Sequence, residues 1–430
     1  MHFSKVSAGL GLMAGAVSAF PTSLESRASS GPMNVVYWGQ NGGSVTENND
    51  LSSYCQGSSG IDILVLAFLN QYGQGKDSPS GTIGQSCSIS NGAGSNCDEL
   101  GSAITTCQSK GIKVMLSLGG AVGPYSLASS SEAQKIADSI WASYGGGSTS
   151  GSRPFGKAVV DGFDFDLESN DGHNAYYADL IKQLRSNFSK DSKRSYYITG
   201  APQCPLPEPN MSVVIDASEF DYLWPQFYNN ACALPVNGAS ASAFNFQNWL
   251  DTTAKGPSAK AKIFVGVPAS PLASNGEQTG AKYYATPDQL ADIVSGIKGN
   301  DRFGGVMMWA AGFSDGNVID GCTYAQQVRS ILDTGKPCGN GPAPVQSSSP
   351  AKSSAPAKTV AGGHPTPTAS PKPTKASSVP TKTPAAGGSG SGSGSVAQWG
   401  QCGGQGYSGP TTCQSPFKCV KVGDFWSQCE

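Results

Sequence analysis

The sequence predicts an α/β catalytic domain with a (β/α)8 barrel (TIM barrel), followed by a disordered Pro/Ser/Thr/Gly linker and a small disulfide-stapled β module. Between residues 31 and 338, eight short apolar runs of strand length alternate with helical or loop segments. Amphipathic stretches over 131–144, 175–186 and 287–296 are expected helices. Such alternation over about 300 residues favours a closed parallel barrel. A doubly wound sheet is the alternative, but no Gly-x-Gly-x-x-Gly motif follows the first strand and no phosphate-binding loop occurs.

The eight expected strands are 34–37, 61–68, 113–118, 162–168, 196–201, 222–226, 261–267 and 305–309. Active sites of such barrels lie at the C-terminal ends of the strands. Five strand ends carry polar or aromatic groups in place of aliphatic core residues, namely 37–41, 117–120, Glu168, 226–229 and 307–309. We expect these ends to line one cleft, with Ser117, Gly119 and Gly120 as packing residues that give it room.

The fourth expected strand carries three acids, Asp164, Asp166 and Glu168, at alternate positions. Because side chains alternate faces along a strand, the acids share one face and the intervening apolar residues share the other. Close like charges raise the pKa of at least one carboxyl, which can then act as a general acid near neutral pH. A Ca²⁺ site or an ordinary solvated edge would also account for an acidic cluster.

Residues 161–168 fit the D-x-x-D-x-D-x-E motif of glycoside hydrolase family 18 and resemble its class III fungal and plant chitinases. Residues 37–41 are similar to the first-strand signature of that family, 117–120 to its third-strand motif and 226–230 to its sixth-strand segment. The resemblance spans nearly all of 31–338. It implies a (β/α)8 barrel that hydrolyses chitin and needs no metal and no cofactor.

The resemblance also implies a mechanism in which the acetamido group of the substrate is the nucleophile. Glu168 is expected to protonate the glycosidic oxygen, and Asp166 to orient the acetamido group and stabilise its charge. Asp164 is expected to pair with Asp166 and share its proton. Tyr228 is expected to donate a hydrogen bond to the acetamido oxygen. The expected substrate-binding residues are Tyr37, Gln226, Asn229 and Trp309.

The N-terminus, residues 1–19, is typical of a secretory signal peptide, because Lys5 precedes an apolar run of small residues. A buried N-terminal helix is the alternative. Twelve cysteines, an even number, suit an oxidising compartment, and we expect disulfides, with the pairing among the eight before residue 339 left open. Asn187 and Asn210 match the N-glycosylation motif. We therefore expect a secreted, extracellular protein.

The composition excludes some partners. The net charge is −2 and charged residues make up 13% of the chain, so there is no electrostatic footprint for nucleic acid. No basic or amphipathic segment indicates a membrane surface, and we expect a monomer. Residues 339–396 consist mainly of Pro, Ser, Thr, Ala, Gly and Lys, with no acid and no aromatic residue. Such a segment cannot bury a core and is expected to be an extended linker.

Aromatic and cysteine residues return over 397–430. A module of this size needs cross-links such as disulfides to be stable. The segment resembles the fungal family 1 carbohydrate-binding module, and this resemblance implies disulfides Cys402–Cys419 and Cys413–Cys429. It also implies a flat sugar-binding face of Trp399, Phe425, Trp426 and Gln428. A toxin-like or inhibitor knot is the alternative.

Together these features predict a secreted endochitinase that acts on chitin and chitin oligosaccharides with retention through an oxazolinium ion. Its C-terminal module would tether it to insoluble chitin or cellulose. One alternative is an endo-β-N-acetylglucosaminidase that cuts N-glycans. Another is an inactive chitin-binding lectin or inhibitor on the same barrel, although the expected catalytic residues are all retained.

Overall fold

The computed structural model describes residues 31–40, 47–148, 151, 153–339, 395–396, 401–403, 411–415, 417–421 and 427–429. The chain divides into two compact units at residues 347 and 348, and each is described by itself. The predicted signal peptide, nearly all of the predicted linker and three residues of the predicted sugar-binding face (Trp399, Phe425 and Trp426) lie outside the described residues.

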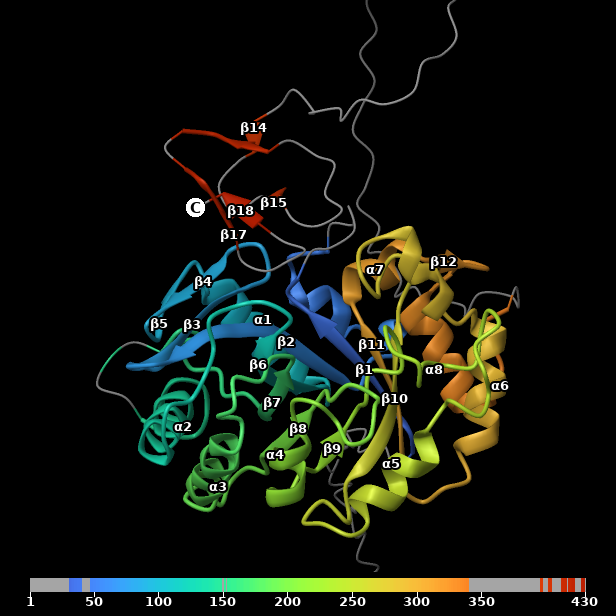
Figure 1. Cartoon of the computed structure of the whole chain (residues 1–430), viewed down its shortest axis with the longest axis horizontal. Coiled ribbons are helices and arrows are strands. Elements are labelled where there is room, and N and C mark those ends of the chain that lie inside the picture. Colours follow the sequence, from blue (N-terminus) through green and yellow to red (C-terminus); the bar gives the residue numbers. More distant parts are fainter. Residues whose placement is uncertain are drawn as a thin grey trace, which may run out of the picture. The chain divides into compact units, whose positions relative to one another are not determined.

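The first unit is a closed parallel barrel, as predicted (Figure 1). Its strands are β1 (Met33–Trp38), β2 (Ile63–Gly73), β6 (Lys113–Gly120), β7 (Gly162–Leu167), β8 (Tyr197–Gly200), β9 (Tyr222–Leu223), β10 (Lys262–Pro268) and β11 (Phe303–Trp309). Each strand pairs with its neighbours in chain order, and β1 pairs in parallel with both β2 and β11, which closes the barrel. All eight predicted strands have a counterpart.

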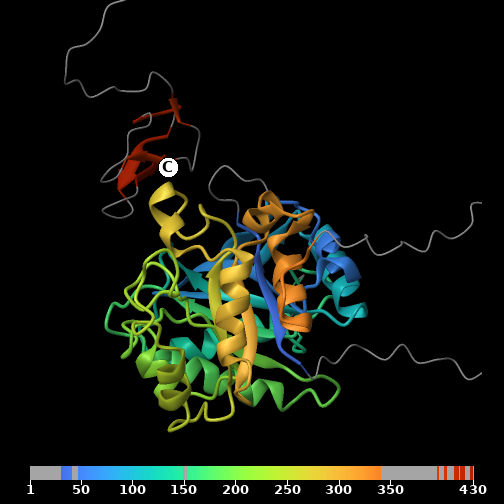
Figure 2. The ribbon, with the colours of Figure 1, turned by 90° about the vertical axis from the view of Figure 1, so that its right-hand side faces the viewer.

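The helices surround the strands. They are α1 (Asp98–Ser109), α2 (Ser130–Tyr144), α3 (Tyr176–Phe188), α4 (Ser212–Ala217), α5 (Phe246–Thr253), α6 (Pro287–Ile297), α7 (Ala311–Gly316) and α8 (Tyr324–Thr334). Three 3₁₀ helices span Leu51–Cys55, Gly57–Ser59 and Gln278–Tyr283. Figure 2 shows α6 and α8 side by side. Both begin with a capping box, at Thr286 and Thr323, which satisfies free N–H groups at the helix start.

An antiparallel extension of the barrel sheet was not predicted. Beyond β2 it consists of β3 (Lys76–Ile83), β4 (Cys87–Ser90) and β5 (Ala93–Ser95), and a disulfide joins Cys87 to Cys97. A short hairpin of β12 (Val318–Ile319) and β13 (Cys322–Thr323) precedes α8. These strands contain many small polar residues, so an alternating apolar pattern does not mark them.

The eight cysteines of the first unit form four disulfides. They are Cys55–Cys107, Cys87–Cys97, Cys204–Cys232 and Cys322–Cys338. The sequence had left this pairing open. No described cysteine is free.

The two faces of β7 differ as the alternation predicts. Phe163 and Phe165 point outward, where their rings meet Phe188 and Tyr177 of α3. Asp164 and Asp166 take the opposite face and are buried inside the barrel. The apolar half of the strand therefore anchors it under a helix, and the acidic half is free to form a site.

The described part of the second unit consists of short strands: β14 (Ser395–Val396), β15 (Gln401–Gly403), β16 (Thr412–Cys413), β17 (Cys419–Lys421) and β18 (Ser427–Cys429). β18 lies between β15 and β17, and β14 pairs with β16. Disulfides join Cys402 to Cys419 and Cys413 to Cys429, the two pairs that the resemblance implied. Among the helices of both units that the structure describes, none is long and apolar enough to span a bilayer.

Candidate active site

Asp164 is the innermost acid, and three hydroxyl groups donate to its carboxylate. Oδ2 accepts from Tyr37 at 2.7 Å and from Ser117 at 2.6 Å, and Oδ1 accepts from Thr199 at 2.6 Å. Ser117 and Thr199 are the register partners of Asp164 on β6 and β8. Burial raises the pKa of Asp164, and the three hydroxyl donors oppose that rise. Ser117 was expected to be a packing residue, and Thr199 was not predicted as part of the site.

Asp166 and Glu168 lie together at the C-terminal end of β7. Their side chains share a hydrogen bond. The amide Nε2 of Gln226 donates to Asp166 Oδ1 at 3.0 Å and to Glu168 Oε1 at 3.2 Å, and it also reaches the carbonyl of Ala201 at 3.1 Å. One amide group thus bridges both acids and the neighbouring strand end.

These contacts set the proton affinities of the pair. Burial raises the pKa of Asp166 well above its usual range, and repulsion by Glu168 and Asp164 raises it further. Burial also raises the pKa of Glu168, while the hydrogen bonds from Gln226 and Asp166 oppose that rise. The charge of Asp164 contributes to the raised pKa of Asp166, and the proton expected between these two acids stays a prediction.

Two further groups fix the backbone around the acids. The Glu168 N–H donates to the hydroxyl of Tyr125 at 2.9 Å, and this hydroxyl donates to the Gly120 carbonyl at 2.7 Å. Gly119 is the register partner of Asp166 and has φ +108°. A Cβ at Gly119 would lie 2.1 Å from the Asp166 carbonyl oxygen, so only glycine permits this approach of the two strands.

Tyr228 is buried near the same two acids. Burial raises the pKa of its phenol well above the usual range, and the charges of Asp166 and Glu168 raise it further. Its hydroxyl makes no hydrogen bond to another described residue. It is therefore available as a donor to a bound molecule.

Tyr37 and Trp309 form the aromatic side of the site. The hydroxyl of Tyr37 donates to Asp164 and accepts from Trp224 Nε1 at 2.9 Å, and Tyr37 is only 2% exposed. Direct substrate contact through this hydroxyl has no structural support, because protein groups occupy it. Trp309 is partly buried and stacks on Phe68 with ring centroids 5.9 Å apart. Its ring also lies 5.7 Å from that of Tyr37.

Comparison with known proteins identifies the family. Residues 33–291 match glycosyl hydrolases family 18, and residues 398–429 match the fungal cellulose binding domain. The chain belongs to glycosyl hydrolases family 18. Endochitinase 2 of Metarhizium robertsii is 54% identical over 440 residues, which cover all of both chains. Chitinase 1 of Rhizopus niveus is 41% identical over 303 residues, which cover 69% of this chain and 57% of that protein.

Two solved structures of similar proteins carry different descriptions. A chitinase from Ipomoea carnea matches with a TM-score of 0.58 and 32% identity, over 69% of this chain and 98% of that one. A xylanase and α-amylase inhibitor protein from Scadoxus multiflorus matches with a TM-score of 0.56 and 30% identity, over 70% of this chain and 97% of that one. The fold of this family 18 chain therefore does not determine its activity without the site.

Asn229 and Gln428 are the remaining predicted binding residues within the described part of the chain. Asn229 is exposed at φ +60°, and its Nδ2 donates to the Ser274 carbonyl at 2.7 Å, which ties two loops together. Gln428 belongs to β18, where it pairs with Gln401 and Val420. Its predicted partners in the sugar-binding face lie outside the described residues.

The glycosylation of Asn187 and Asn210 stays a prediction, and the structure places both side chains in buried positions. Asn187 is 1% exposed, its Nδ2 donates to Asp138 at 2.8 Å, and its Oδ1 accepts from Lys190 at 2.7 Å. Asn210 is also buried, at 9% exposed, with its backbone N–H donating to Glu208. A short sequence motif carries no information on burial.

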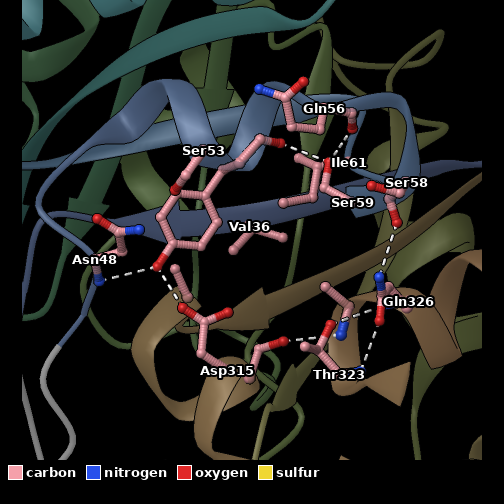
Figure 3. A pocket seen from close by; sticks show the side chains of 14 residues that line it. Val36, Asn48, Ser53, Gln56, Ser58, Ser59, Ile61, Asp315, Thr323 and Gln326 are labelled. Atoms are coloured by element: carbon pink, nitrogen blue, oxygen red, sulfur yellow. Dashed lines mark hydrogen bonds between the residues drawn. The ribbon is translucent and has the colours of Figure 1, made fainter. Parts of the chain in front are cut away.

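Figure 3 shows a pocket apart from the family 18 acids, lined by residues around the first two 3₁₀ helices, α7 and the start of α8. Its volume is about 250 Å³. The Tyr54 hydroxyl donates to Asp315 at 2.5 Å and accepts from the Asn48 N–H at 3.2 Å. Gln326 donates to the Ser58 carbonyl at 3.0 Å. These polar groups form hydrogen bonds with one another, so the pocket is a contact region between the two 3₁₀ helices, α7 and α8 in which they are paired.

No metal centre emerges from the geometry of the described residues. The group close enough to share an ion consists of Cys402, Cys413 and Cys429. Their sulfur atoms form disulfides and are unavailable as thiolate ligands.

Proposed function

We propose that this protein is an endochitinase that hydrolyses β-1,4 linkages between N-acetylglucosamine units and retains the anomeric configuration. The observation that carries the proposal is the grouping of Glu168, Asp166 and Tyr228, with Gln226 bridging the acids and the Tyr228 hydroxyl unpaired. The similarity to proteins named endochitinase supports it.

In the proposed mechanism, Glu168 is the general acid. Burial raises the pKa of its carboxyl, so it holds a proton into the range where an ordinary glutamate is ionised. It protonates the glycosidic oxygen while the carbonyl oxygen of the neighbouring acetamido group attacks the anomeric carbon. The sugar–oxygen bond breaks, and an oxazolinium ion forms. Water, deprotonated by Glu168, then opens the oxazolinium ion with net retention.

Asp166 and Tyr228 would position the acetamido group. The Asp166 carboxylate accepts from the acetamido N–H and balances the positive charge that develops, and the Tyr228 hydroxyl donates to the acetamido oxygen. For this, the Asp166 side chain must leave the proton that it shares with Glu168 on Glu168 and exchange their hydrogen bond for one with the substrate. Tyr37, Ser117 and Thr199 would hold Asp164 in place below the pair. Trp309 would form an apolar surface for the sugar ring.

The other parts of the chain fit an extracellular enzyme for insoluble polymers. We propose residues 1–19 as the signal peptide, 31–338 as the catalytic domain, 339–396 as the linker and 397–430 as the polysaccharide-binding module. The match of 398–429 to the fungal cellulose binding domain supports the last assignment. A flexible tether raises the local concentration of the catalytic site along a polymer surface.

The direct test is hydrolysis of chitin oligosaccharides by the full chain, with the anomer of the new end followed by NMR. Initial β-anomer is expected, and Glu168→Gln should abolish turnover while Glu219→Gln, an exposed control, leaves it unchanged. An active Glu168→Gln variant would refute the assignment. Hydrolysis of a glycoprotein substrate in place of chitin would support the endo-β-N-acetylglucosaminidase alternative. If neither substrate is hydrolysed, the result would support an inactive chitin-binding lectin or inhibitor.

The module is tested separately by co-sedimentation of the full chain with chitin and with cellulose. Replacing Trp399 and Trp426 by alanine should reduce the bound fraction on the preferred polymer, because aromatic rings stack on pyranose rings. Unchanged sedimentation would show that binding does not use this face.

A further inference from the structure

A groove lies along the loops that follow β9 and β10. Its volume is about 570 Å³. The lining includes Asn229, Asn230, Asn237, Lys282 and Tyr283. Asn229 and Asn230 directly follow Tyr228 in the chain, so one wall of the groove is continuous with the proposed acetamido donor.

The groove is also joined to the acid pair on its inner side. Asn230 Nδ2 donates to Gln203 Oε1 at 3.3 Å. Gln203 pairs through an isolated parallel bridge with Gln226, the residue whose amide contacts both Asp166 and Glu168. These contacts tie the wall of the groove to the residue that bridges the two acids.

Hydrogen bonds between the two loops keep the groove open. Asn237 Nδ2 donates to the Tyr284 carbonyl at 2.9 Å and to the Lys282 carbonyl at 3.3 Å. Asn229 Nδ2 donates to the Ser274 carbonyl at 2.7 Å. Since the walls are tied together in the free protein, a ligand does not have to order them.

The lining has a specific chemistry. The asparagines use their N–H groups on the protein, and within the described residues their amide oxygens accept no hydrogen bond, so they can accept from ligand hydroxyl or amide groups. Lys282 is the one charged residue among those that line the groove, and Lys282 Nζ lies 4.9 Å from the centroid of the Tyr283 ring. Among the described residues it forms no ion pair. Its positive charge is therefore uncompensated in the groove.

We propose that this groove binds sugar units next to the reacting one and selects N-acetylated units over deacetylated, protonated ones, with Lys282 as the specificity-determining residue. The inference rests on the proposed chitinase function. The reacting unit needs its acetamido group in any case, so the selection concerns its neighbours. A protonated amine about 6 Å from the Lys282 ammonium, at an effective dielectric constant of about 40 to 80, is disfavoured roughly 3- to 10-fold.

The test uses the full chain and a partially deacetylated chitin polymer. The wild type, Lys282→Gln, Lys282→Glu and the control Lys157→Gln each digest it, and mass spectrometry reads the units that flank each cut. Lys157 is an exposed lysine that precedes β7, at the other end of the barrel. Hydrolysis of the fully acetylated hexamer is measured alongside.

The wild type and Lys157→Gln should enrich acetylated units about 3- to 10-fold at one flanking position. The enrichment should fall toward one in Lys282→Gln and reverse in Lys282→Glu, and it should vanish for the wild type at a pH where the sugar amines are neutral. Equal enrichment in the wild type and Lys282→Gln, with the hexamer still cleaved, would overturn the inference alone. Failure of the wild type to cleave the hexamer would overturn the proposed function as well.

Discussion

Replacing Tyr37 by phenylalanine tests whether hydroxyl groups hold the innermost acid in place. The change removes one oxygen and two hydrogen bonds, a donor to Asp164 at 2.7 Å and the acceptor for Trp224 Nε1 at 2.9 Å. A hydrogen bond to a charged group contributes about 1.5–3 kcal/mol, and an orphaned buried N–H costs about 1–3 kcal/mol. The expected loss is about 3–5 kcal/mol, or roughly 5–8 °C in the unfolding temperature of a domain of this size.

Tyr144→Phe is the matched control. Tyr144 is 1% exposed, and its hydroxyl has no hydrogen-bond partner among the described residues. Because its removal leaves no partner unpaired, the variant should unfold at or slightly above the wild-type temperature. The unfolding temperatures of the wild type, Tyr37→Phe and Tyr144→Phe are measured by near-UV circular dichroism of the oxidised full chain. Equal unfolding temperatures for Tyr37→Phe and Tyr144→Phe would refute the reasoning.

The loss in Tyr37→Phe should also depend on pH. Burial already places the folded-state pKa of Asp164 above its unfolded value, so ionisation of this acid costs stability as the pH rises through that interval. Removing a hydroxyl donor raises the folded-state pKa of Asp164 further. The difference from the wild type should thus be smaller in acid, where Asp164 is protonated in both proteins and mainly the cost of the unpaired Trp224 N–H remains, and full near neutral pH. A pH-independent difference would place the effect elsewhere.

Two other changes probe the acid pair. Gln226→Leu removes the amide that lowers the pKa of both Asp166 and Glu168. As a result, kcat/KM should fall roughly 10²-fold, and the alkaline limb of the pH–rate profile should move to higher pH. An alkaline limb at the wild-type pH would contradict the bridging role of Gln226. Gly119→Ala places a Cβ 2.1 Å from the carbonyl oxygen of Asp166. This variant should unfold in much less denaturant than Gly172→Ala, whose positive φ is similar but whose Cβ has no atom within 4 Å. Equal midpoints of denaturant unfolding for the two variants would show that the structure relaxes around the added Cβ.

The barrel was predictable because its strands are buried on both faces and therefore read as apolar runs. The acid positions followed from alternation along one strand. The hydroxyl groups that donate to Asp164 could not be predicted in this way. Ser117 and Thr199 are 47 and 35 residues away in the chain and contact Asp164 only through the register of neighbouring strands. A serine or threonine on the inner face of a strand is a weak signal until its register partner is known.

Other structural features could not be predicted from the sequence, for different physical reasons. The antiparallel strands over Lys76–Ser95 are held by backbone pairing and one disulfide, with few apolar side chains to mark a period. Tyr37 was expected at the substrate, and that role stays a prediction; its hydroxyl donates to Asp164, a contact that the position of Tyr37 at a strand end did not indicate. Asn187 matches a modification motif on a helix face that packs against Asp138.

The barrel pairs its first strand with its last, and this order has a consequence for folding during synthesis. Met33 pairs with Gly305, so the first strand must wait for about 270 residues before its last neighbour exists. At roughly 5–20 residues per second this takes about 15 to 55 seconds. The four bridges of the barrel unit span at most 52 residues, and each can close soon after its second cysteine emerges. Oxidation can therefore fix the loops locally while the nascent sheet still has two open edges, and ring closure by β11 is the step that ends its exposure to other chains.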